Sequence, residues 1–254
     1  NNQSKYNYPN LNYALFSENI FYLSKKFSIT PGFRYEYIKT ESEGFYKKIN
    51  LDGAGNVILN KTIDDSEIRE RNFFLFGLGL SFKSSKAMDF YGNISENYRS
   101  VTFADISISN PAYSINPEIS DENGYTIDLG IRGNYFRRFS YDIGFFSLFY
   151  KDRIGFVQKA FKDGSVKSEK GNVGDAVMYG LESLIDFDLN DIFIKNNNLS
   201  LNYFINSSFI NSKYTESMEP GVKGKKVEFV PKLNIKSGFK FGYKNLSLNI
   251  QYTY

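Results

Sequence analysis

Apolar and polar residues alternate with a period of two along almost the whole chain, and this pattern constrains the fold more than any other feature. In the segment 72–83 every even position between the ends is apolar, namely Phe74, Phe76, Leu78, Leu80 and Phe82. Successive side chains of a β-strand point to opposite faces, so the alternation predicts strands with one apolar and one polar face. The chain has no apolar run of the ~18–20 residues that a transmembrane helix requires. The predicted fold class is therefore all-β.

The alternation predicts ten strands, which we place at about 11–24, 27–41, 68–83, 87–99, 123–135, 139–157, 175–189, 198–212, 226–243 and 246–254. Several of them exceed the ~5–6 residues that are usual in globular sheets. Their lengths fit better the ~9–11 residues that a tilted strand needs to cross a bilayer.

The connections between the predicted strands alternate between short and long. The short ones are 25–26, 84–86, 136–138, 190–197 and 244–245, and the long polar ones are 42–67, 100–122, 158–174 and 213–225. Outer-membrane barrels have short periplasmic turns and long external loops. A soluble sandwich has no reason to sort its connections in this way, so the sequence predicts an antiparallel transmembrane β-barrel.

The aromatic content supports this prediction. The chain has 20 Tyr and 25 Phe among 254 residues, although its mean hydropathy of −0.40 would suit a soluble protein. Aromatic residues gather near the short connections, at Phe136, Phe139, Tyr141 and Tyr243. Aromatic rings are enriched where a barrel meets the membrane–water interface, so we expect these four to belong to an interfacial girdle.

Composition excludes several functions. The chain has no Cys and no His, which removes disulfides, the thiolate and imidazole ligands of metals, and the commonest general base. A Ser/Asp pair without such a base is not a convincing hydrolase, so we expect no enzyme, no metal site and no cofactor. The net charge of +3 is too small, and the basic residues too scattered, to indicate nucleic acid as a partner.

Several residues fit the strand pattern poorly, including Ser17, Asn19 and Ser147, which are polar residues on apolar parities. Glu96 falls on the apolar parity of strand 87–99. A charge near the outer rim of a barrel costs only ~0–1 kcal/mol, so Glu96 is expected at the rim unless a β-bulge reverses the parity there. Pro31 interrupts the apolar face of strand 27–41 and cannot donate to a ladder, which weakens that prediction.

Several stretches resemble the C-terminal barrel of TonB-dependent receptors, particularly the ferric dicitrate type. They are YALFSEN at 13–19, ITPGFRYE at 29–36, NYRSV at 97–101, FADI at 103–106, GY at 124–125 with DLG at 128–130, YGLE at 179–182, FVP at 229–231 and FGY at 241–243. Each fragment alone is weak, but together they follow the family order over nearly the whole chain.

The resemblance implies a barrel of about twenty-two strands that is plugged by an N-terminal globular domain. Residues 1–254 would then be a partial barrel domain, without the plug and the closing strands. The topology points the same way, because strands 11–24 and 246–254 would leave both ends of the segment outside the cell, whereas both termini of a bacterial barrel are expected in the periplasm.

The function that the resemblance implies is active transport across the outer membrane of a Gram-negative bacterium. The receptor would bind a ferric chelate, a siderophore or a ferric citrate-like complex, at its extracellular face and import it with energy from TonB, which contacts the plug. Outer-membrane lipid and lipopolysaccharide would surround the barrel. The alternative is a diffusive porin-like or structural barrel, which would need no plug.

Three arginines are candidates for the chelate-binding site. Arg69 and Arg71 share the lumen-facing parity at the outer end of strand 68–83, and Arg99 ends strand 87–99 on its lumen parity. The planar guanidinium suits anions with oxygen edges. Pairing Lys83 with Ala87 across the short turn would place Arg71 opposite Arg99. The alternative is that these arginines only pair with carboxylates of the rim and loops, such as Glu67 or Glu70.

Overall fold

The computed structural model describes residues 4–106, 113–136, 138–160, 164, 166–194 and 198–254. Its strands are β1 Ser4–Asn7, β2 Asn10–Glu18, β3 Phe21–Tyr22, β4 Phe27–Leu51, β5 Val57–Lys83, β6 Met88–Arg99, β7 Tyr113–Ile115, β8 Glu122–Tyr135, β9 Phe139–Ala160, β10 Val166–Asp188, β11 Leu199–Glu216, β12 Leu233–Tyr243 and β13 Leu246–Thr253. The helical segments are α1, Phe103–Ile106, and the π-helix η1, Asn190–Ile194. No helix in the described ranges is long and apolar enough to span a membrane.

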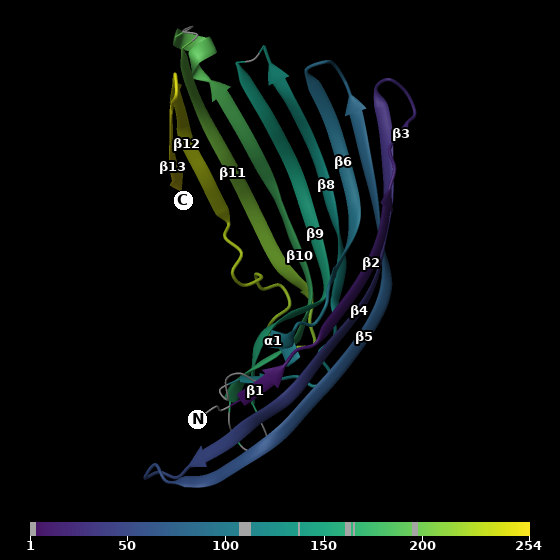
Figure 1. Ribbon diagram of the computed structural model, residues 1–254, viewed down its shortest axis with the longest axis vertical. Helices are drawn as coiled ribbons and strands as arrows, with labels where there is room; N and C mark the ends of the chain where they lie inside the picture. The colour runs from purple at the N-terminus through teal and green to yellow at the C-terminus, as the bar shows by residue number, and fades with distance from the viewer. Residues whose placement is uncertain (1–3, 107–112, 137, 161–163, 165, 195–197) are drawn as a thin grey trace.

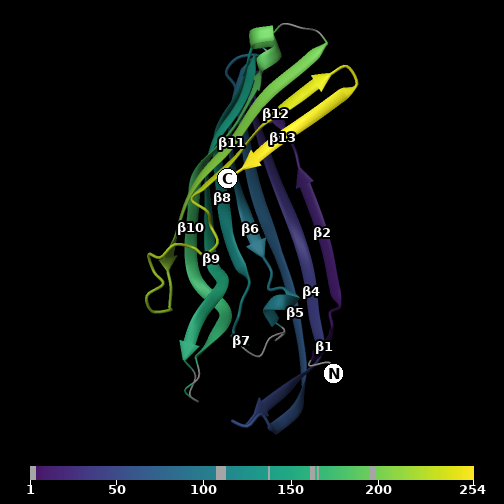
Figure 2. The same cartoon turned by 90° about the vertical axis from the view of Figure 1, so that its left-hand side faces the viewer.

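All these strands join one curved sheet that forms a wall (Figures 1 and 2). Along the wall the order is β1-β4-β5-β6-β8-β9-β10-β11-β12-β13, and β2 and β3 lie beside β4 in line with β1. Because β1, β2 and β3 together fill one strand position, the wall has the ten positions that the alternation predicts. Neighbouring wall strands are antiparallel. Within the described residues, β13 and the β1–β3 edge do not pair with each other, so the sheet is not closed.

The connections that the sequence predicts to be short lie at one end of the wall, and those that it predicts to be long lie toward the other. Figure 1 shows the β3–β4, β5–β6, β8–β9, β10–β11 and β12–β13 connections at the upper end. The β4–β5 hairpin, α1 and the segment between β11 and β12 lie toward the lower end. We refer to these as the short-turn end and the long-loop end.

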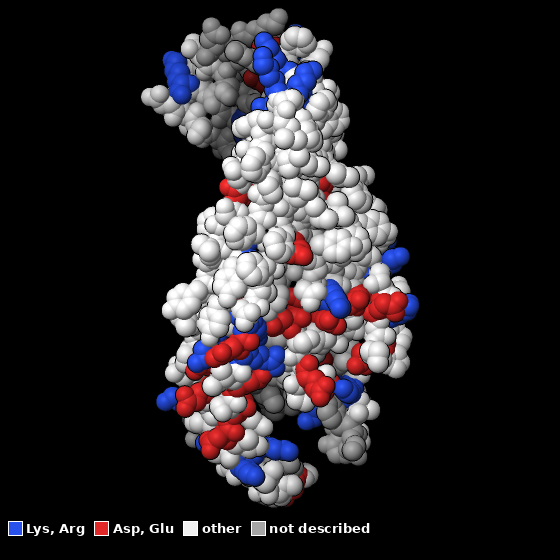
Figure 3. Space-filling view, turned by 90° about the vertical axis from the view of Figure 1, so that its right-hand side faces the viewer, with Lys and Arg blue, Asp and Glu red and all other residues white. Residues whose placement is uncertain are grey.

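The convex face of the wall is apolar. In β5 the even positions from Phe74 to Phe82 are between 38% and 59% exposed, whereas the odd positions between them are less exposed and face the concave side. Figure 3 shows this face as a broad, largely uncharged band with a few isolated acidic groups, between clusters of charged residues toward both ends. The five alternating residues of β5 are thus exposed on a common face and are not packed under a second sheet, as the barrel hypothesis predicts.

A row of aromatic rings crosses the wall near its short-turn end. Register places its members directly opposite one another on five successive strands, in the order Tyr135, Phe139, Phe187, Tyr203 and Phe239. Neighbouring ring centroids in this row are 4.9–6.4 Å apart. The row contains Phe139, one of the predicted girdle residues; Phe136 meets Tyr135 edge to face, and the ring of Tyr141 lies tilted beside Phe139. Cross-strand aromatic pairs of this kind stabilise a sheet and suit a membrane interface.

On the concave face, small residues make room for a large ring. Tyr91 lies opposite Gly130, which in turn lies opposite Gly144. A Cβ atom at Gly130 would overlap the ring of Tyr91. The Tyr91 hydroxyl donates to Asp142 at 2.7 Å, which fixes the ring across these strands.

The prediction of a loop at 42–67 is wrong. β4 and β5 continue through it as a paired ribbon, and the connection is only the turn at 52–56. The segment is rich in polar residues and has no continuous apolar alternation, which is typical of a loop, but a ribbon that projects beyond an apolar band needs no apolar face. β1 widens the ribbon by pairing with residues 43–46 of β4.

The predicted strand 11–24 is broken in the structure. β2 ends at Glu18 and β3 begins at Phe21 without a change in register against β4. The break lies opposite Pro31, whose carbonyl accepts from the Asn19 amide at 3.2 Å. Proline has no N–H to give in return, so the ladder is interrupted at this point.

Three further boundaries differ at the long-loop end. β9 and β10 extend into the predicted loop 158–174, and β11 extends into 213–225. By contrast, residues 226–232 of the predicted strand 226–243 are not in a strand. Val227 of this segment is instead buried: it is 3% exposed and packs against Val173, Ala176 and Tyr214. Pro231 cannot donate a hydrogen bond to a ladder.

Candidate functional site

The three candidate arginines lie on the wall at the long-loop end of the apolar band. Arg69 and Arg71 are on β5 with the lumen-facing parity, and Arg99 is the last residue of β6. The predicted pairing of Arg71 with Arg99 is wrong. The turn is longer than expected, so Lys83 lies opposite Asp89 rather than Ala87, and the β5–β6 ladder ends at Gly77 and Ser95. This shift by two residues keeps the predicted faces but separates the two arginines.

What gathers the arginines is the segment between β6 and β8. Arg71 Nε donates to Asp121 at 2.6 Å, and Arg69 Nη1 donates to the Ile119 carbonyl at 2.6 Å. Arg99 Nη1 donates to Glu122 at 2.7 Å. Each guanidinium therefore holds residues that follow β7 in the chain. Arg69 also pairs with Glu67. All three arginines therefore pair with carboxylates of the rim and loops, as the alternative interpretation of the sequence expects.

Arg71 keeps unused hydrogen-bonding capacity. Its side chain is 9% exposed, and Nη1 donates to Thr40 Oγ1 at 3.2 Å. Its Nη2 is buried and has no hydrogen-bond partner in the described chain, and the same holds for Ser42 Oγ. Ser42 is two residues beyond Thr40 on the same face of β4. A buried donor without a partner costs ~1–3 kcal/mol or more, so this part of the wall would gain from an added acceptor.

Asp105 of α1 anchors the start of the segment, and its side chain is fully buried. It accepts from the Thr102 amide at 2.7 Å and the Thr102 hydroxyl at 2.8 Å, and it pairs with Arg99 Nη2 at 3.2 Å and with Lys170 of β10. Burial alone would raise the pKa of Asp105. The bonds from Lys170 and Thr102 and the charge of Arg99 outweigh burial and hold this pKa below its ordinary value.

The segment thus forms a strap across the concave face. β7 pairs in parallel with residues 168–170 of β10, at the far side from β6. Beneath the strap, Val101, Ile119 and Ile154 form a small buried cluster with Phe103 and Ile115. We call the described parts of this segment, residues 100–106 and 113–121, the strap. The sequence contains no signal for it, because Asp105 and Lys170 meet only through the tertiary fold.

The strap should stay docked in weak acid. A depressed carboxylate pKa adds stability that is fully present above the unfolded value near 4 and is lost as the pH falls through the lower folded value. We therefore expect the hydrogen-exchange protection factor of the Thr102 amide, corrected for the intrinsic exchange rate, to stay constant from pH 7 to about 5. Below about 4 this protection should be lost. The Ile94 amide is the control. Loss of protection near pH 6 would contradict the role of Asp105.

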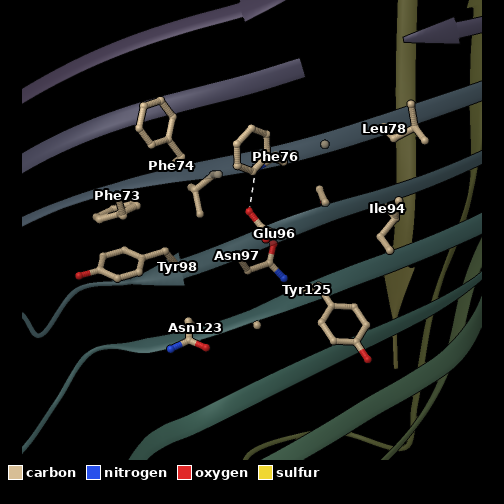
Figure 4. A pocket seen from close by; sticks show the side chains of 14 residues that line it. Phe73, Phe74, Phe76, Leu78, Ile94, Glu96, Asn97, Tyr98, Asn123 and Tyr125 are labelled. Carbon is tan, nitrogen blue, oxygen red and sulfur yellow. Dashed lines mark hydrogen bonds between the residues drawn. The ribbon is translucent and has the colours of Figure 1, made fainter. Parts of the chain in front are cut away.

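A lateral seam opens in the wall between β5 and β6. Beyond Gly77 and Ser95 no ladder joins these strands, and the Glu96 carboxylate accepts from the Phe76 amide at 2.9 Å in place of a main-chain oxygen (Figure 4). Glu96 is exposed on the apolar face, as its parity predicts, and no bulge reverses β6 there. A hollow of about 800 Å³ occupies the seam; its lining includes Phe74, Phe76, Leu78, Ile94 and Tyr125.

Tyr98 connects the seam with the arginines. Its parity matches that of Glu96, but its ring stacks on Phe73 of the lumen face with a centroid distance of 3.8 Å (Figure 4). Its hydroxyl donates to Asp121, the partner of Arg71. A second hollow of about 310 Å³ is lined by Arg99, Glu122, Leu148 and Tyr150 and shares Asn97, Tyr98 and Asn123 with the first.

An antiparallel wall with an apolar outer face, a row of aromatic rings and sorted connections has the features of an outer-membrane-type β-barrel. All residues, 1–254, match the family model described as "TonB dependent receptor-like, beta-barrel". The chain belongs to this family, whose barrels are outer-membrane receptors and transporters and not enzymes. No curated protein sequence matches it.

Solved structures of the same fold include the ferric yersiniabactin uptake receptor FyuA from Yersinia pestis, with 17% identity and a TM-score of 0.67 over 98% of this chain and 34% of that one. The ferric citrate transporter FecA in its unliganded form has 16% identity and a TM-score of 0.59 over 98% of this chain and 42% of that one. The copper transporter OprC has 14% identity and a TM-score of 0.66 over 95% of this chain and 34% of that one. The chain spans about a third to two fifths of their lengths. At these identities the likeness concerns the fold alone.

Proposed function

We propose that this chain is part of the barrel of an outer-membrane receptor that binds a ferric chelate at its extracellular face and imports it with TonB energy. In this proposal the long-loop end faces the cell exterior, lipid and lipopolysaccharide cover the apolar band, and TonB acts through a plug domain inside the complete barrel. Arg69, Arg71 and Arg99 contact the chelate. A siderophore or ferric citrate-like complex fits these residues, because its carboxylate and other oxygen edges match guanidinium donors.

The observation that carries the proposal is the unpartnered Nη2 of Arg71 on the lumen wall. An anionic chelate would supply the missing acceptor and would compete with Asp121 for the rest of the guanidinium. Hydrogen bonds to charged groups contribute ~1.5–3 kcal/mol, enough for a ligand to exchange with one internal carboxylate.

Two observations favour a receptor over a diffusive porin-like barrel. The strap crosses the concave face from β6 to β10, where an open channel would need free space. The similar structures are also uptake proteins, and their names include ferric yersiniabactin, ferric citrate and copper. The RagAB peptide transporter has the same fold, with a TM-score of 0.60, so the choice of an iron chelate rests on the arginines and not on the fold.

The full-length receptor with Arg71→Ala and Arg99→Ala should lose affinity for ferric citrate, our probe, by tenfold or more, which corresponds to ~1.4 kcal/mol. Titration calorimetry on the purified receptor measures the change. The matched control is Arg132→Ala with Arg138→Ala, which removes two arginines that pair with Asp89 and Asp191 toward the short-turn end. Unchanged affinity in a folded Arg71/Arg99 variant would mean that these residues only anchor the strap.

A further inference from the structure

The side chains that line the seam between β5 and β6 suit an apolar group. Its outward hollow has the aromatic and aliphatic side chains of Phe74, Phe76, Leu78, Ile94 and Tyr125 along its sides. All five belong to the exposed apolar face of the wall. Main-chain hydrogen bonds close the rest of the β5–β6 boundary up to Gly77 and Ser95, so the hollow occupies the part of this boundary that no ladder seals.

The two sides of the seam differ in their charged groups. On the outward side the charged residue in the lining is Glu96, whose carboxylate would repel the phosphate of a membrane lipid. On the inner side the hollow that shares Asn97, Tyr98 and Asn123 is lined by Arg99 and Glu122, which pair with each other, and Tyr98 reaches the Asp121–Arg71 pair. Among the described residues Nη2 of this Arg71 has no acceptor, so an anionic group is favoured on the inner side and an apolar group on the outer side.

We propose that the seam is an alkyl-chain subsite, and that the transported ligand is an amphiphilic anion. Its charged end is held by Arg71 and Arg99, and its hydrocarbon chain passes between β5 and β6 beside Tyr98 into the outward hollow. The proposal rests on the proposed function and names the substrate class more narrowly. It also gives Glu96 a role, since its bond to the Phe76 amide satisfies the β5 backbone where the strands diverge.

The test uses two charge-matched probes, the ferric complexes of citrate methylamide and citrate octylamide. The full-length receptor in lipid nanodiscs should bind the octyl complex at least tenfold more tightly than the methyl complex. Each buried CH₂ favours binding, so the difference measures contact along the chain. The variant Phe76→Ala with Leu78→Ala should lose most of this preference, and Leu78→Ala alone should lose part of it.

The matched control is Leu80→Ala with Phe82→Ala, on the same strand and the same apolar face but outside the lining of the hollow. It should keep the preference for the octyl complex, because partitioning of the chain into lipid is equal in all variants. Circular dichroism and heat-dependent gel mobility confirm that each variant is folded.

Three outcomes would overturn the inference. If both complexes bind equally to the native receptor, there is no alkyl subsite, although the proposed function stands. If the octyl preference survives equally in both double variants, the chain lies elsewhere, in lipid or on another surface. If neither complex binds, the proposed function and this inference fail together.

Discussion

Arginine in place of Leu80 should lower the free energy of unfolding of the barrel in a bilayer by about 2–4 kcal/mol. Leu80 is 41% exposed on the apolar face of β5, between Leu78 and Phe82, so the guanidinium would face hydrocarbon. Arginine in place of the adjacent Ser81 should cost less than about 1 kcal/mol, because that position faces the lumen at almost the same height.

Urea unfolding of the full-length receptor in lipid vesicles, followed by circular dichroism, measures both changes. The pair is well matched, since the two variants have the same charge, size and depth and differ only in the face they occupy. Equal destabilisation of the two variants would contradict the assignment of faces. Greater loss from Ser81→Arg would reverse it.

The second large effect is expected at the anchor of the strap. Asp105→Asn keeps the shape of the side chain but removes the charge that Arg99 and Lys170 share. Breaking a buried ion pair costs ~3–5 kcal/mol, and we expect about 3 kcal/mol here because Arg99 remains 42% exposed and keeps Glu122. Since each 1.4 kcal/mol is a factor of ten, the strap should open roughly a hundredfold more often.

Limited proteolysis within residues 100–121 reports this opening when cleavage is slow relative to reclosure. Asp52→Asn is the matched control, because it makes the same chemical change in the exposed β4–β5 turn, where Asp52 accepts from the amides of Ala54 and Asn56. It should leave cleavage of the strap unchanged. An Asp105→Asn variant with native cleavage rates would show that the hydrophobic cluster around Val101 holds the strap without the ion pairs.

The faces and the number of wall positions could be predicted from the sequence because both depend on local chemistry. Residues such as Phe76 and Leu78 gain from an apolar medium, whereas Gly77 and Gly79, which alternate with them, do not need one, so a period of two assigns each residue to a face. The same logic placed Glu96 on the outer face. It also located the short connections, since Lys25–Lys26 and Lys244–Asn245 interrupt two apolar patterns.

Where the chain projects beyond the apolar band, this logic no longer applies. The sequence at 42–51 and 57–67 has no continuous apolar alternation, and cross-strand hydrogen bonds make these segments a ribbon. The register between β5 and β6 could not be predicted from hydrophobicity either. Lys83 opposite Ala87 and Lys83 opposite Asp89 give identical faces, so hydrophobicity could not distinguish them, and the turn length decided between them.

The sequence predicts which residues belong to the candidate site but not how they are arranged in space. Arg69, Arg71 and Arg99 could be selected by parity and position. Their present partners could not, because Asp121, Ile119 and Asp105 reach them through a strap that folds back over the wall and pairs with β10. Tyr98 was unforeseen for a similar reason, since it leaves the face that its parity assigns only because β5 and β6 diverge beside it.

We expect the convex face of this wall to meet lipid and the concave face to meet water. Single nitroxide labels at each position from 74 to 82 of the full-length receptor in lipid test it directly, with oxygen and a water-soluble nickel chelate as relaxation agents. Oxygen accessibility should peak at positions 74, 76, 78, 80 and 82, and nickel accessibility at the odd positions between them. Accessibility without a period of two, or with the two agents exchanged, would contradict the account.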